Sequence, residues 1–150
     1  SATGNTMSVT TSSLTVSSDT SYGAQTVVAG TSNVKLASFN IKGSSAEKVN
    51  VTSIALKVDN NNAANNNAVV SNLKLYKGAD NTGTQLGSTQ ATVTDNTAMT
   101  ISVSGLLLEK GEEISVSVYA DISSSFADAI HTLFSMILSF SLITLTSSGL

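Results

Sequence analysis

The residues that could do chemistry in this chain are few and dispersed. His131 is the only histidine, and the sequence offers no partner that would make it a general base. Serine and threonine are abundant, but no G-x-S-x-G nucleophile elbow occurs. The absence of cysteine excludes thiol catalysis, disulfides and thiolate metal sites. We therefore predict a protein that is not an enzyme and has no cofactor.

Two polar clusters contain the oxygen ligands that Ca²⁺ prefers. One is Asp59 with Asn60, Asn61 and Asn62, and the other is Asp80 with Asn81. Neither matches the spaced D-x-[DN]-x-[DN]-G loop with its distal Glu. Asp and Asn are also ordinary turn residues, so we predict loops at both places and no metal site.

Two covalent modifications are compatible with the sequence. Asn50-Val51-Thr52 is its only N-x-[ST] sequon, which makes Asn50 a candidate for glycosylation. A self-catalysed Lys–Asn crosslink would need a buried lysine beside an asparagine and a carboxylate, and Lys35 or Lys57 could supply the lysine. Lysine on an outward strand face is the commoner case, where it discourages unwanted edge pairing.

The composition excludes several classes of partner. The chain has 150 residues, enough for one domain, and a net charge of -3 from seven basic and ten acidic residues. This balance leaves no basic stripe for nucleic acid. Sugar-binding platforms usually use exposed aromatic rings, but tryptophan is absent, and Tyr22, Tyr76 and Tyr119 are far apart in the sequence. Glycans are therefore the least favoured of the partners that the sequence allows.

The elements that must position these residues are strands. Apolar residues recur at every second position from Val34 to Ile122, which is typical of half-buried antiparallel strands. In two segments the apolar phase changes, near Ala37-Ser38 and within residues 49–58, which predicts β-bulges. We expect short edge strands at residues 73–76, 85–87 and 91–93, a hairpin turn over 78–83, and a turn from Gly105 to Gly111.

This spacing of strands and turns predicts an all-β fold, an immunoglobulin-like antiparallel β-sandwich of about seven to nine strands. Residues 1–24 form a polar N-terminal arm in this interpretation, and residues 25–150 form the sandwich. Because 41% of the residues are hydrophobic and the net charge is small, a packed fold is favoured over disorder.

The segment from Leu133 to Leu145 fits a strand or a helical stripe, and we choose the strand because Ser, Thr and Phe are mediocre helix formers. It is shorter than the roughly 20 apolar residues of a membrane helix, so no membrane span is predicted. As a strand, its apolar face would consist of Phe134, Met136, Leu138, Phe140 and Leu142.

The chain begins Ser1-Ala2-Thr3-Gly4, as a secreted protein would after cleavage of its signal peptide. We therefore expect export to the cell surface or the extracellular space.

Five segments carry a resemblance to a known class of module. They are residues 26–31 (TVVAGT), 36–41 (LASFNI), 51–56 (VTSIAL), 72–78 (NLKLYKG) and 114–122 (ISVSVYADI). In their apolar spacing and turn residues they resemble the Ig-like modules of bacterial and archaeal surface proteins. Such modules usually stand in tandem, whereas here one module follows an arm, which is similar to extracellular filament subunits that donate a terminal strand.

These observations lead to one functional hypothesis and one alternative. The hypothesis is a pilus-like homopolymer built head to tail by β-strand donation, with Met7, Val9, Leu14 and Val16 as the donor side chains. The C-terminal apolar strand is a second donor candidate, and the arm could instead be the first strand of its own sandwich. The alternative function is an adhesive or spacer Ig-like module of a larger surface protein.

Overall fold

The computed structural model describes residues 14–22, 26–58, 70–94, 97–124 and 131–132, and these contain strands, turns and bends but no helix. Accordingly, nothing in these ranges is a helical candidate for crossing a membrane. The strands are β1 (Thr15–Ser18), β2 (Thr26–Val27), β3 (Val34–Lys42), β4 (Val49–Lys57), β5 (Val70–Lys77), β6 (Thr84–Thr92), β7 (Ala98–Leu108), β8 (Glu113–Ile122) and β9 (His131–Thr132).

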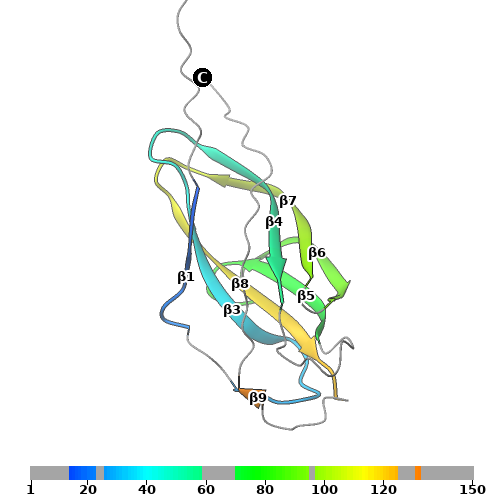
Figure 1. The fold of residues 1–150 in the computed structure, drawn as a ribbon. Coiled ribbons are helices and arrows are strands. Elements are labelled where there is room, and N and C mark those ends of the chain that lie inside the picture. The colour runs from blue at the N-terminus through cyan, green and yellow to red at the C-terminus, as the bar shows by residue number, and fades with distance from the viewer. Residues whose placement is uncertain (1–13, 23–25, 59–69, 95–96, 125–130, 133–150) are drawn as a thin grey trace, which may run out of the picture.

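The strands form two facing layers (Figure 1). One layer is a five-stranded sheet in the order β1-β3-β8-β5-β6, and the other is the pair β4-β7. A short third pairing joins β2 to β9 at one end of the molecule. All of these pairings are antiparallel. The predicted all-β antiparallel sandwich is therefore confirmed.

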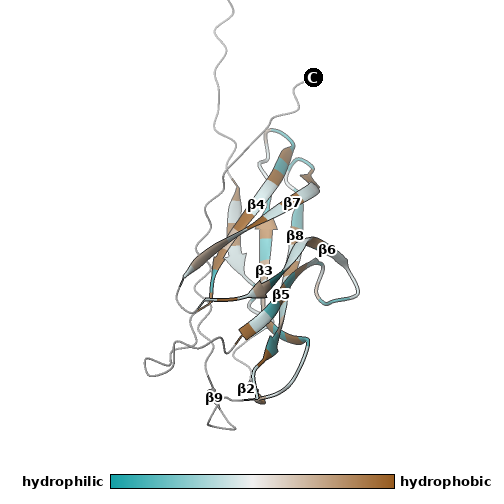
Figure 2. Cartoon of the chain, turned by 90° about the vertical axis from the view of Figure 1, so that its right-hand side faces the viewer, coloured by the Kyte–Doolittle hydropathy of each residue, from teal (hydrophilic) through white to brown (hydrophobic). Residues whose placement is uncertain are grey.

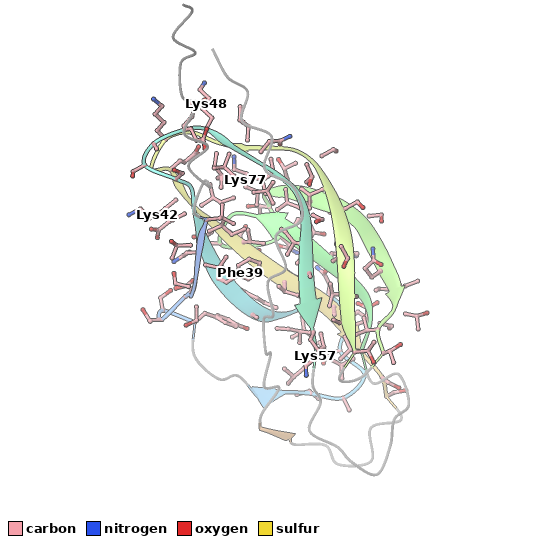
Figure 3. The ribbon with its side chains drawn as sticks, turned by 45° about the horizontal axis from the view of Figure 1, so that its top comes forward. Phe39, Lys42, Lys48, Lys57 and Lys77 are labelled. Atoms are coloured by element: carbon pink, nitrogen blue, oxygen red, sulfur yellow. The ribbon has the colours of Figure 1, made fainter. Side chains whose placement is uncertain are left out.

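The hydrophobic core lies between the two layers. Phe39, Leu56, Leu73 and Val118, from four different strands, are all 0% exposed. Figure 2 shows the alternation that places them there, with brown apolar segments separated by pale or teal polar ones along the strands. In Figure 3, Phe39 lies in the interior, whereas the labelled lysines lie at the periphery. The period-two pattern therefore directs apolar side chains inward and hydroxyl or charged side chains outward.

Both predicted phase changes coincide with shifts in strand register, and the one in β3 is a β-bulge. The β3–β8 register shifts between Lys35 and Ala37. Leu36 and Phe39 are therefore both buried, although they are three positions apart and would point to opposite faces of a regular strand. The β4–β7 register shifts between Val51 and Ser53. A bulge adds a residue to one strand and reverses the phase beyond it, and it thereby keeps each half of the strand in the core.

The predicted turn from Gly105 to Gly111 is present but begins later than expected. β7 continues through Gly105 to Leu108, and Gly105 has a φ of +72° within the shifted part of the β4–β7 ladder. The chain turns only afterwards, where the N–H of Glu112 donates to the carbonyl of Glu109 at 3.0 Å. Glycine adopts the left-handed conformation as readily in a distorted strand as in a turn. The presence of Gly105 alone therefore did not distinguish a strand irregularity from a turn.

The expectation that residues 73–76 form an edge strand is also wrong. They belong to β5, which lies between β8 and β6, whereas the borders of this sheet are β1 and β6. The hairpin between β5 and β6 is confirmed, with Lys77 opposite Thr84. Alternation identifies the buried face of a strand but carries no information on how many neighbours the strand has.

Candidate assembly edge

The two long sides of the sandwich are built differently. On one side β6 lies against β7 (Figure 1). At Gly87 of β6 a Cβ atom would lie 2.4 Å from the carbonyl oxygen of Ser102 and 2.6 Å from Cγ2 of Ile101, and Gly87 has a φ of +72°. Only glycine allows this approach of one backbone to another. We call this side the closed edge.

On the other side the terminal strands are β1 in the five-stranded sheet and β4 in the two-stranded sheet. Among the residues that the structure describes, no strand pairs with the outer border of either. Leu14 and Val16 pack against the core here but are only partly buried. We call this side, formed by the outer borders of β1 and β4, the open edge.

β1 comes from the segment predicted as a donor arm. It pairs with β3 of the same chain, with Thr15 opposite Lys42 and Val16 opposite Ile41. Two of the predicted donor side chains, Leu14 and Val16, thus lie on the core of their own sandwich. The other two, Met7 and Val9, lie outside the described residues. The intramolecular first strand is therefore the arrangement observed for residues 15–18.

A turn after β1 fastens it to the sheet. The N–H of Asp19 donates to the carbonyl of Ser38 at 3.1 Å, and the N–H of Tyr22 donates to the carbonyl of Asp19 at 3.1 Å. The Asp19 carboxylate accepts a hydrogen bond from the N–H of Ser21 at 3.0 Å and another from its hydroxyl. The Ser21 hydroxyl is the main reason why the pKa of Asp19 lies below its usual value. Asp19 is thus an ionised turn residue at the end of β1.

Tyr22 and Lys35 complete this attachment. The Tyr22 hydroxyl donates to the carbonyl of Lys35 at 2.5 Å, and Lys35 Nζ lies 4.3 Å from the centroid of the Tyr22 ring, within cation–π range. The same ammonium donates to the carbonyl of Ala79 at 2.7 Å. Partial burial, with a smaller contribution from Tyr119, raises the pKa of Tyr22, so the phenol remains a donor at neutral pH. We call residues 14–22 with these contacts the β1 unit.

The three tyrosines gather on the outer face of the five-stranded sheet, although their sequence spacing did not predict this. Tyr76 and Tyr119 pack edge to face with their centroids 5.6 Å apart. Lys35, whose ammonium lies over the Tyr22 ring, is opposite Tyr119 in the β3–β8 register. Tyr119 is only 8% exposed. The tyrosines thus lie close together in the fold although they are far apart in the sequence; Tyr76 and Tyr119 pack directly against each other, and Lys35 lies over the Tyr22 ring.

Asp121 is a second carboxylate held by main-chain and amide donors. It accepts from the N–H of Asn33 at 2.7 Å and from Nδ2 of Asn72 at 2.8 Å. The Asn72 amide contributes most to lowering the pKa of Asp121. Asn33 and Asn72 have positive φ angles of 54° and 50°, a conformation that Asn tolerates better than most residues. The cluster fixes loop and bulge geometry at the end of β8.

The remaining predicted sites are distributed over the fold. Asp80 accepts from the N–H of Thr82 at 2.9 Å within the β5–β6 turn, which is the turn use that its sequence context predicted. Asn50 is half-buried on β4, opposite Leu107. Lys57 is at the end of β4 remote from Lys48 (Figure 3). The described part contains no group of three metal-ligating side chains.

Two predicted groups of residues fall outside the described ranges, and the histidine belongs to a short strand. The Asp59–Asn62 cluster and the C-terminal set Phe134, Met136, Leu138, Phe140 and Leu142 lie outside the described residues. His131 belongs to β9, where its backbone is paired with Val27.

The attachment of β1 was missed by the sequence analysis. Asp19-Thr20-Ser21 has the composition of an Asx turn, a signal that could have been used. Nothing in the sequence couples Tyr22 to Lys35, since their contact depends on the path of the chain between them.

Comparisons of the chain with protein-family models, with curated proteins and with solved structures give no match.

Proposed function

We propose that this chain is a structural subunit of an extracellular filament, assembled head to tail by β-strand donation. The observation that supports the proposal best is the difference between the two sides of the sandwich. β6 and β7 seal the closed edge through Gly87, while β1 and β4 end their sheets on the other side. A terminal strand presents a row of main-chain donors and acceptors that an added strand satisfies.

The chemistry of the chain suits such a contact. Main-chain hydrogen bonds would supply affinity, and alternate apolar side chains such as Leu14 and Val16 would select the register. A contact between two different surfaces of identical copies extends into a fibre when its rotation does not close a ring. Charged residues make up only 11% of the chain, so repulsion between stacked copies is weak. The immunoglobulin-like topology and the extracellular location belong to this proposal.

Electron microscopy and light scattering of the full chain and of two truncations test the proposal. Fibres should form from the full chain and from a chain lacking residues 1–13, which retains β1. A chain lacking residues 1–20 should remain monomeric, because it has lost Leu14 and the whole of β1, including Val16. Circular dichroism of this last variant checks that the sandwich persists. A full chain that stays monomeric at all concentrations contradicts the proposal.

The C-terminal segment is the second donor candidate, so a chain ending at residue 132 is the matched comparison. If it forms fibres as the full chain does, the donor is N-terminal. If it alone loses assembly, the donor is C-terminal.

An adhesive or spacer module of a larger surface protein is the second candidate function. The intramolecular pairing of β1 with β3 favours it, because a module that supplies its own edge strand needs no neighbour. This candidate predicts that all of the truncations above are monomers.

A further inference from the structure

We propose that the β1 unit is the exchangeable element, binding to β3 of a second copy through the same contacts that it makes within one chain. This inference rests on the proposed function and specifies its donor and its acceptor. The donor is residues 14–22, and the acceptor is the border of β3 that β1 covers within one chain, with the backbone of Lys35 and Ser38; this border becomes exposed when β1 leaves. The partner is a second copy of this chain.

β1 is the element of the sandwich that is most easily detached. It has four residues and one strand neighbour, β3, whereas β3 and β8 have nine and ten residues and two neighbours each. Its two core-directed side chains are only partly buried. Local opening is easiest where few buried contacts are lost, so β1 should separate without unfolding the rest.

The contacts of the β1 unit are equally available on another copy. The hydrogen bonds from Asp19 N–H to Ser38 and from the Tyr22 hydroxyl to Lys35 end on main-chain carbonyls of β3. Lys35 lies over the Tyr22 ring from the same strand. An exchanged unit would recover all of these bonds, so the cis and trans forms differ mainly in the entropy of association. This equality of contacts is why exchange of an identical element is a low-cost route to assembly.

The closed edge cannot exchange a strand in this way. β6 is held to β5 by a hairpin at residues 78–83, with Lys77 opposite Thr84, and it is locked to β7 at Gly87. β1 has an open border on its other side, so no strand of the described part must move when it leaves. Exchange is therefore confined to the open edge.

The connection sets the distance between copies. Tyr22 and Thr26 are joined by Gly23, Ala24 and Gln25, and four Cα–Cα steps reach at most about 14 Å. An exchanged unit must therefore bind a copy that is in direct contact with its own. A repeated contact of this kind gives a compact fibre.

Engineered disulfides provide a direct test, since the chain has no cysteine. Thr15 and Lys42 are opposite each other on β1 and β3, and both are exposed. Directly paired antiparallel residues have the Cα separation that a disulfide requires. Lys77 and Thr84 form a matched control, because they are again an exposed Thr–Lys pair in register but belong to one hairpin.

The double variant Thr15→Cys with Lys42→Cys is assembled under reducing conditions, oxidised as fibres and separated on a denaturing gel without reductant. We expect a ladder of covalent multimers, whereas fibres of Lys77→Cys with Thr84→Cys should give single chains. Single chains from both variants would overturn the exchange while leaving filament formation by another donor intact. Absence of fibres under every condition would instead overturn the proposed function, and the exchange with it.

A second measurement uses the same variants as monomers. Oxidation before assembly locks β1 in cis, so the Thr15/Lys42 variant should lose at least about tenfold in assembly rate and regain it when reductant is added. The Lys77/Thr84 control should assemble equally well in both states. Unimpaired assembly of the locked monomer would show that β1 does not exchange.

Discussion

The closed and open edges show two solutions to the same problem, the border of a β-sandwich. At the closed edge, Gly87 allows the backbone of β6 to pack closely against that of β7, so this border is covered by close packing. At the open edge, the border of β3 is covered by β1, a strand of four residues fastened by Asp19 and Tyr22. The short strand has fewer buried contacts to lose than the close-packed β6–β7 border, so it should open more easily. The exchange that we propose requires this difference.

Substitution of Gly87 should break the closed edge. In Gly87→Ala the new Cβ would meet the Ser102 carbonyl at 2.4 Å, and the residue would keep a left-handed φ of +72°. Overpacking and backbone strain together should cost about 3 kcal/mol of unfolding free energy, measured by urea denaturation.

Gly105→Ala is the matched control, because Gly105 has the same φ of +72° with nothing within 4 Å of the added Cβ. Only the backbone cost of about 1 kcal/mol should appear. Equal losses for the two variants would mean that backbone strain alone, without close contact to β7, explains Gly87.

Core truncations should distinguish β1 from the fully buried interior. Leu56 of β4 is 0% exposed, so Leu56→Ala should cost about 3 kcal/mol through lost burial and a cavity. Val16 of β1 is only partly buried, and Val16→Ala should cost about 1 kcal/mol. Amide hydrogen exchange adds a sharper readout, since Val16→Ala should speed exchange in β1 and leave β5 unchanged. Equal stability losses would place β1 within the cooperative core and argue against its exchange.

The smallest expected effect is a pH dependence that compares the two sides. Asp19 follows β1 and Asp80 lies in the β5–β6 turn, and in each case the hydroxyl two residues later is the main cause of a lowered pKa. A lowered folded-state pKa gives stability that is present above the unfolded pKa of about 3.9 and is lost as the pH falls through the folded value. Asp19→Asn and Asp80→Asn should therefore each flatten the decline of the unfolding midpoint between pH 6 and pH 3.

The two aspartates should differ in their local effect. Asp19→Asn should increase amide exchange in β1, whereas Asp80→Asn should affect β1 much less, because its turn reaches the β1 unit only through the Lys35 ammonium, which donates to the carbonyl of Ala79. Identical exchange profiles would show that the turn at Asp19 does not hold β1.

The sequence determined which face of each strand is buried. Alternation of Ile114, Val116 and Val118 with serines and a tyrosine sufficed for β8, and the phase changes around Leu36 and Val51 correctly indicated shifts in strand register. These features depend on local backbone geometry, because side chains on a strand have a period of two. The same information was insufficient for Gly105, where a bulge and a turn need the same conformation, and for β5, whose neighbours are set by topology.

Only the tertiary structure decided which borders are sealed and which are open. Nothing near Gly87 in the sequence reveals that β7 packs against it. Nothing near Tyr22 reveals that its hydroxyl donates a hydrogen bond to the main-chain carbonyl of Lys35. Such contacts join residues brought together by the order of strands in the sheets, and that order depends on how all the strands pack at once. Residue types fixed the layers of this protein, while the arrangement of the layers created the open edge, at which we propose that a second copy binds.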